Sequence, residues 1–118
     1  MQAAEPLLEL LDLHVAAFNL GVEAGDWEPM LDGLTPDAEL VFVGAPAGPF
    51  RGRDAIGDAY RASPPDDAVS VLEASIVGGE VVASYGWRRG GGEKAGLMLL
   101  TPREGKLRRV VVTFDPPP

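Results

Sequence analysis

Residues 50–60 read Phe-Arg-Gly-Arg-Asp-Ala-Ile-Gly-Asp-Ala-Tyr, and this stretch leads from a turn into a helix. Asp54 is a preferred N-cap residue, because its carboxylate can accept a hydrogen bond from a free N–H of the first helical turn. Ile56 and Tyr60 follow at helical spacing and therefore share one apolar face. The pattern predicts a helix that begins at Asp54 and ends before Pro64, which cannot continue it.

The sequence on either side of this stretch predicts two further helices and five strands. Residues 5–24 carry apolar side chains at three- and four-residue spacing, which predicts an amphipathic helix ended by Gly25. Asp26 then caps a short helix over residues 27–34, and a turn follows at 35–37. Strands are expected over residues 38–43, 68–77, 80–89, 93–101 and 106–114. Short glycine-bearing turns join the last four, so these form an antiparallel meander, and the whole order is typical of an α+β fold.

Length and composition exclude several classes of protein. The 118 residues fit one domain, and no linker or repeat divides residues 1–118. The absence of cysteine and the single histidine argue against disulfides and metal sites. A net charge of −8 argues against nucleic acid or an anionic membrane as a partner. We expect a cytoplasmic protein without cofactor or metal, since no signal peptide or membrane-spanning run is present. Eight arginines to two lysines, with 15 glycines and 11 prolines, are typical of a high-GC bacterial gene.

Three stretches carry a resemblance to a known family. They are Gly25-Asp26-Trp27, Pro36-Asp37-Ala38-Glu39-Leu40, and Phe50-Arg51-Gly52-Arg53-Asp54-Ala55-Ile56 with Tyr60. With the element order, they resemble the SnoaL-like and ketosteroid-isomerase-like superfamily over nearly the whole chain. The resemblance implies the cone-shaped α+β barrel of nuclear transport factor two, in which N-terminal helices pack on a strongly curved, mixed but mostly antiparallel sheet. Because the family contains isomerases, polyketide cyclases, dehydratases, epoxide hydrolases and non-catalytic binding domains, function has to be argued from the site.

In this family the helices and the concave face of the sheet enclose a pocket, and strand alternation predicts which side chains enter it. Pairing Trp87 with Ala95 across the glycine turn would set Tyr85 opposite Leu97 on that face. An apolar, aromatic lining results, which suits a small hydrophobic molecule held by one or two hydrogen bonds. The expected ligand-binding residues are His14, Phe18, Leu40, Phe42, Tyr60, Tyr85, Trp87, Leu97, Val112 and Phe114.

The positions at which ketosteroid isomerases carry catalytic groups hold hydrocarbon side chains here. The resemblance puts the carboxylate base at Phe42, the phenol donor at Phe18 and the carboxylic acid near Leu97. Since none of these side chains can transfer a proton, we expect a domain that binds a small apolar molecule without the family's catalytic carboxylates. The alternative is a cofactor-free isomerase, polyketide cyclase, dehydratase or epoxide hydrolase, with His14 or a tyrosine as the acid–base group. Asp115 is expected to be a surface carboxylate.

The opposite face of the sheet is also expected to be apolar. Its predicted members are Val41, Val43, Val82, Gly86, Met98, Leu100, Val111 and Thr113. A patch of this kind usually marks an interface. Family members often dimerise through this sheet, so we expect a homodimer. A dimerisation module without any cavity is a third possibility, whereas a carboxylate within reach of His14 or Tyr85 would favour the enzyme.

Overall fold

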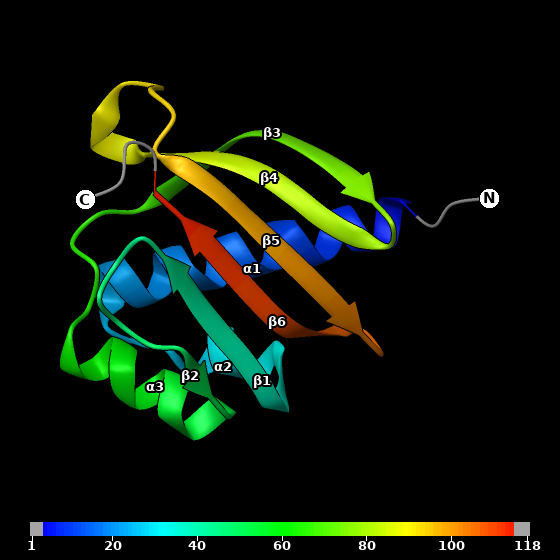
Figure 1. The fold of residues 1–118 in the computed structure, drawn as a ribbon. Helices are drawn as coiled ribbons and strands as arrows, with labels where there is room; N and C mark the ends of the chain where they lie inside the picture. The colour runs from blue at the N-terminus through cyan, green and yellow to red at the C-terminus, as the bar shows by residue number, and fades with distance from the viewer. Residues whose placement is uncertain (1–3, 115–118) are drawn as a thin grey trace.

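This computed structural model describes residues 4–114. They fold into three α-helices and a six-stranded sheet, with connecting loops (Figure 1). The helices are α1 (Ala4–Ala24), α2 (Glu28–Asp32) and α3 (Arg53–Ala62), with a short 3-10 helix, η1 (Arg88–Gly90). The strands are β1 (Leu34–Val43), β2 (Phe50–Arg51), β3 (Val69–Val77), β4 (Glu80–Trp87), β5 (Gly96–Arg103) and β6 (Lys106–Thr113).

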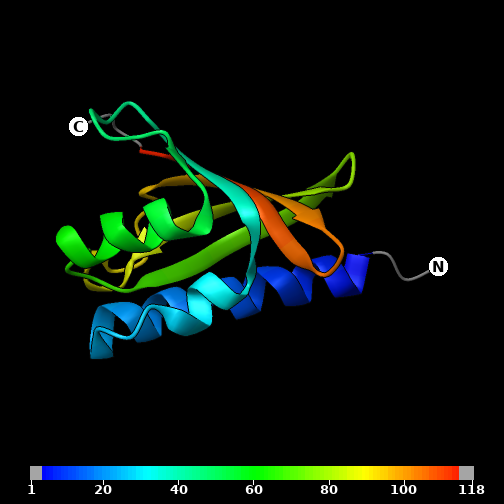
Figure 2. The ribbon, with the colours of Figure 1, turned by 90° about the horizontal axis from the view of Figure 1, so that it is seen from below.

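The strands form one mixed sheet in the order β2-β1-β6-β5-β4-β3. Strands β1 and β6 run parallel, and the other neighbouring pairs are antiparallel. The sheet curls without closing, and α1 and α3 lie along its concave side (Figure 2). This arrangement confirms the predicted α+β fold, in which helices pack on a strongly curved, mostly antiparallel sheet.

A close contact between α1 and the segment after it sets how the first two helices meet. Gly25 ends α1 with a φ of 73° and donates its N–H to the Gly21 carbonyl at 2.8 Å, as expected of a left-handed cap. The Trp27 ring then packs directly against Gly21, where an added Cβ would lie 2.2 Å from a ring carbon. Only glycine therefore allows Trp27 to fold back onto α1 and enter the core.

Several element boundaries differ from the sequence-based prediction. Gly52, with a φ of 93°, occupies the N-cap position of α3, and Asp54 lies within the first turn instead. Strand β1 begins at Leu34, which pairs with Leu107, and pairing resumes only at Glu39. Residues 35–37, predicted to be a turn, form a bulge between these two pairs, which local pattern cannot distinguish from a turn. The two-residue strand β2 was not predicted because it is too short to show alternation.

The register between β4 and β5 differs from the prediction by one residue. Tyr85 pairs with Gly96 rather than Leu97, and Ala83 pairs with Met98. The cause is an asymmetric connection, because η1 takes up residues 88–90 on one side of the turn only. A slip of one residue moves side chains to the other face, so Met98 and Leu100 point inward and Leu97 and Leu99 point outward. The predicted outer face was therefore wrong at Met98 and Leu100.

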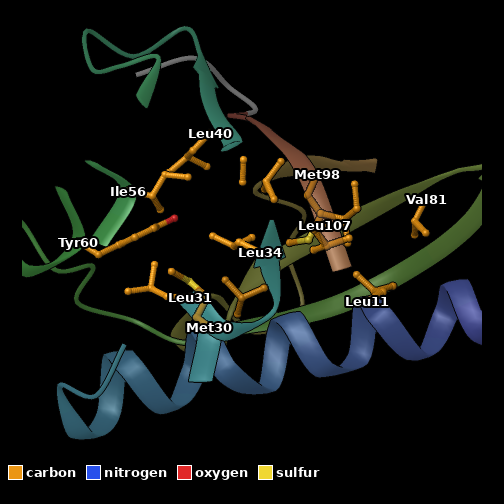
Figure 3. Close-up of a cluster of buried hydrophobic side chains, with 14 of the residues drawn as sticks. Leu11, Met30, Leu31, Leu34, Leu40, Ile56, Tyr60, Val81, Met98 and Leu107 are labelled. Atoms are coloured by element: carbon orange, nitrogen blue, oxygen red, sulfur yellow. The ribbon is translucent and has the colours of Figure 1, made fainter. Parts of the chain in front are cut away.

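The hydrophobic core fills the space between the helices and the concave face of the sheet (Figure 3). Leu11 of α1, Leu31 of α2 and Ile56 of α3 meet side chains of β1, β4, β5 and β6 there. The fully or nearly fully buried members drawn from the sheet include Leu34, Leu40, Val81, Leu100, Leu107 and Val110. Of these residues, Val110 also borders a cavity beside the core.

Candidate functional site

A cavity of about 520 Å³ lies between α1, α3 and the concave face of the sheet. Its walls are His14, Val15 and Phe18 of α1; Ala59, Tyr60 and Ala62 of α3; Ser63, Pro65 and Ala47 of the loops; and Phe42, Phe50, Val69, Tyr85, Trp87, Met98, Val110, Val112 and Phe114. Seven of the chain's eight aromatic side chains are in this set. No Asp, Glu, Lys or Arg of residues 4–114 is among them.

Most residues predicted to bind a ligand are brought together at this cavity. His14, Phe18, Phe42, Tyr60, Tyr85, Trp87, Val112 and Phe114 line it. Leu40 does not line the cavity, because its side chain is buried in the core. In the sheet it pairs with Phe50 on one side and Val110 on the other. Leu97 does not line the cavity either, because the register slip turns it to the outer face and puts Met98 in the wall.

Two large side chains of the wall, Met98 and Phe50, were not among the predicted ligand-binding residues. The glycine at position 96 is the sequence feature that could have indicated the inward orientation of Met98. An added Cβ at Gly96 would lie 2.0 Å from the Thr113 carbonyl oxygen and 3.0 Å from the Tyr85 hydroxyl, so a side chain such as Leu97 cannot stand opposite Tyr85. Phe50 lies on β2 beside Leu40, and its ring meets that of Phe42 edge-on with centroids 6.3 Å apart.

The helical side of the cavity is built on three rings in mutual contact. Tyr60 stacks on Trp27 with centroids 4.8 Å apart and an interplanar angle of 19°. Phe18 meets both rings edge-on, at 5.9 Å from Trp27 and 6.0 Å from Tyr60. Such contacts each contribute about 1 kcal/mol beyond burial, and together they fix the ring of Tyr60 in one orientation.

His14 brings an imidazole into this apolar wall. Burial lowers the pKa of His14 to about 4, so the ring is neutral at neutral pH. No hydrogen-bond or ion-pair partner within residues 4–114 meets either nitrogen of the imidazole. A neutral ring of this kind offers one donor and one acceptor to whatever enters the cavity.

The two tyrosines of the wall differ in their hydrogen bonding. The Tyr85 hydroxyl donates to the Thr113 carbonyl at 2.9 Å, and burial raises the pKa of Tyr85 to about 12. The Tyr60 hydroxyl has no partner within residues 4–114. Burial, with a smaller contribution from the nearby Tyr85, raises the pKa of Tyr60 well above its ordinary value. Both phenols therefore stay protonated across the physiological range.

Two anchors hold the wall near the start of β3. The Asn19 side chain on α1 accepts a hydrogen bond from the Val69 N–H at 2.8 Å and donates to the Val69 carbonyl at 3.0 Å. Asp67 accepts from the N–H groups of Ala68 and Arg89, at 2.8 and 3.0 Å. These bonds tie α1, β3 and the segment after β4 together around Trp87.

Metal-binding clusters and membrane-spanning helices are both absent from residues 4–114. No group of three or more His, Asp or Glu side chains there could hold a metal ion. No described helix is long and apolar enough to cross a membrane.

Solved structures with the same fold are numerous. A candidate ketosteroid isomerase from Kribbella flavida is 19% identical, with a TM-score of 0.75 over 93% of this chain and 78% of its own. A nuclear transport factor 2-like protein of unknown function from Burkholderia xenovorans is 20% identical, with a TM-score of 0.75 over 97% and 86%. TerC, co-crystallised with polyporic acid, is 23% identical, with a TM-score of 0.71 over 94% and 92%.

These likenesses show the fold, and no curated protein matches the sequence. The family itself is shown by the sequence, because the model of the SnoaL-like domain matches residues 14–115. That range includes His14 at one end and reaches past the last described strand, so it spans both walls of the cavity. The chain therefore belongs to the SnoaL-like domain family.

Proposed function

We propose that this chain binds a small, neutral, apolar molecule in the cavity between α1, α3 and the sheet, without turning it over. The observation that carries the proposal is the lining, which is largely aromatic and aliphatic and, within residues 4–114, holds no ionisable acid or base apart from His14 and the two tyrosines. Burying an ion in such surroundings without a counter-charge costs several kcal/mol, so a neutral ligand fits best.

The size and shape of the space support the same class of ligand. A volume of about 520 Å³ lies within the range of small-molecule sites. Rings line it on all sides, from Phe18 and Tyr60 on the helices to Phe42, Tyr85 and Trp87 on the sheet. A flat, mostly hydrocarbon molecule would contact these faces and edges closely. TerC, with the same fold, was co-crystallised with polyporic acid, which supports the use of this fold for holding small molecules.

The alternative, a cofactor-free isomerase, cyclase, dehydratase or epoxide hydrolase, rests on His14 as its acid–base group. The depressed pKa of His14, about 4, makes the imidazole a weak base for proton abstraction at neutral pH. No Asp or Glu of residues 4–114 lies in the lining to orient it, and Asp115 lies outside the described residues. These two observations favour binding over catalysis.

The proposal can be tested by native mass spectrometry for a co-purified ligand and by titration with Nile red, a neutral apolar dye. Ala59 of α3 lines the cavity, whereas its neighbour Asp58 points to solvent. Ala59→Leu should therefore fill part of the space and weaken dye binding about tenfold. The cause is a smaller cavity volume, since the substitution leaves the charge of the lining unchanged. Asp58→Leu is the matched control and should bind as the parent does. Equal binding by both variants, or none by the parent, would reject the cavity as a binding site.

We also propose a homodimer formed through the outer face of the sheet. The corrected apolar patch there is Val41, Val43, Val82, Leu97, Leu99 and Val111, and Val43 is 51% exposed. On one side of the patch Glu39 bridges Arg51 and Arg109, each at 3.2 Å. On the other side lie Glu73 of β3 and Glu80 of β4. A two-fold axis through the patch would set the arginines of one copy against these acids of the other.

Sedimentation equilibrium tests this arrangement. Leu99→Glu puts a charge in the middle of the patch and should convert a dimer to a monomer, because both copies would bury it. A parent protein that sediments as a monomer at micromolar concentration would reject the dimer. The cytoplasmic location expected from the sequence stays a prediction.

A further inference from the structure

The hydroxyl of Tyr60 is a polar group that the fold itself does not use. It ends in the interior of the cone, on a ring that reaches in from α3 (Figure 3). Across the cavity, the hydroxyl of Tyr85 already donates to the Thr113 carbonyl at 2.9 Å. The cavity thus has one phenol whose proton is committed to the protein and one, on Tyr60, without an acceptor in residues 4–114.

The ring of Tyr60 cannot turn away to find another partner. The stack on Trp27 at 4.8 Å holds one face, and the edge contact from Phe18 at 6.0 Å holds another side. Trp27 is itself fixed against Gly21, whose missing side chain makes room for the indole. The hydroxyl therefore has a set position, which is the condition for a hydrogen bond that discriminates between ligands.

A ligand that fills the cavity displaces solvent from this hydroxyl, and an oxygen acceptor on the ligand then replaces the hydrogen bond that is lost. Because burial keeps the phenol of Tyr60 protonated, it can act as a donor throughout the neutral range. A pure hydrocarbon ligand would displace water from the hydroxyl and leave it without any partner. A ligand with a carbonyl or ether oxygen at the right place would satisfy it.

We propose that Tyr60 is the specificity-determining residue of the cavity and selects neutral apolar molecules that present an oxygen acceptor to its hydroxyl. This inference rests on the proposed binding function. It assigns to α3 the polar contact that orients the ligand, and it leaves Tyr85 to hold β4 against β6. His14, on α1, is another polar group of the same lining.

Two ligands of one shape test the assignment. Acetylnaphthalene and its isopropenyl isostere differ only in that a carbonyl oxygen replaces a methylene carbon. Titration calorimetry would give both dissociation constants for the parent protein, Tyr60→Phe and Tyr85→Phe. The parent should prefer the ketone about tenfold, as expected when a buried donor is either paired or left unpaired. Tyr60→Phe should bind both ligands equally, and Tyr85→Phe should keep the preference.

The possible outcomes separate the two proposals. If Tyr60→Phe keeps the preference, or the parent binds both ligands equally, Tyr60 is not the discriminating residue although the cavity still binds. If neither ligand binds the parent protein, the proposed function itself fails and the assignment fails with it. Because Tyr60→Phe removes a hydroxyl without a partner in residues 4–114, its circular dichroism spectrum and melting curve should match those of the parent.

Discussion

The tyrosines on the two walls of the cavity differ in what their hydroxyls bond. On the sheet wall, Tyr85 donates to Thr113, and the Thr113 hydroxyl accepts from the Leu97 N–H at 2.9 Å. On the helical wall, the phenol of Tyr60 and the imidazole of His14 have no partner in residues 4–114. The difference teaches that the Tyr85 hydroxyl serves the fold, whereas the Tyr60 hydroxyl is free to bond a molecule in the cavity, as the proposed function requires.

The largest effect is expected from Gly96→Ala, which attacks the sheet wall. The added Cβ would lie 2.0 Å from the Thr113 carbonyl oxygen, a backbone atom that cannot rotate away, and 3.0 Å from the Tyr85 hydroxyl. We expect the free energy of unfolding to fall by about 4 kcal/mol, because strain and a lost hydrogen bond combine. Urea denaturation measures it. Gly90→Ala is the control, since an added Cβ at Gly90 meets only a Trp87 carbon at 3.8 Å and should change little.

The helical wall should make stability sensitive to acid through His14. Its pKa is about 4 in the folded state and 6.5 in the unfolded chain, so the unfolded state binds the proton more tightly. The free energy of unfolding should therefore fall as the pH drops from 6.5 to 4, by up to about 3 kcal/mol from this group.

The measurement is a pair of urea titrations as a function of pH, on the parent protein and on His14→Gln. Hydrogen bonds hold the pKa values of Asp37 and Asp67 below their usual range. Protonation of these two carboxylates therefore also lowers the free energy of unfolding in acid. The difference between the two profiles isolates His14. Parallel profiles between pH 6.5 and 4 would mean that the imidazole is solvated rather than buried in the wall.

The smallest effects compare the two phenols directly. Tyr85→Phe leaves the Thr113 carbonyl without its donor and should lower the free energy of unfolding by about 1 kcal/mol. Tyr60→Phe removes a hydroxyl that has no partner among the described residues and should leave the free energy of unfolding unchanged within about 0.5 kcal/mol. Urea denaturation of both variants, without ligand, gives the two values. A larger loss in Tyr60→Phe would contradict the contrast between the walls.

The helical wall was more predictable from the sequence than the sheet wall. His14, Phe18 and Tyr60 were found because helical spacing is local, and one turn fixes the next. Met98 was missed because its orientation depends on where β5 begins, and η1 shifts that point by one residue. The hydrogen bonds that distinguish Tyr85 from Tyr60 could not be predicted at all, since they join strands far apart in the chain.

The fold class and the family followed from patterns that survive such errors. A slip of one residue exchanges Leu97 for Met98 and Leu99 for Leu100, and all four are apolar. Strand β5 is therefore hydrophobic on both faces whichever register holds, and the predicted α+β fold is unaffected. The identity of the lining residues depended on register, and only the three-dimensional structure supplied it.

The two hydrogen bonds of Asn19 protect this protein against aggregation through an exposed edge strand. Strand β3 stands at the rim of the sheet, where unpaired backbone groups invite a strand from another molecule. Asn19 occupies both groups of Val69 and so imitates one residue of a neighbouring strand. The backbone of β3 is thereby already hydrogen-bonded at the end nearest the cavity. A strand from another molecule could not pair with β3 at Val69, in the wall of the cavity.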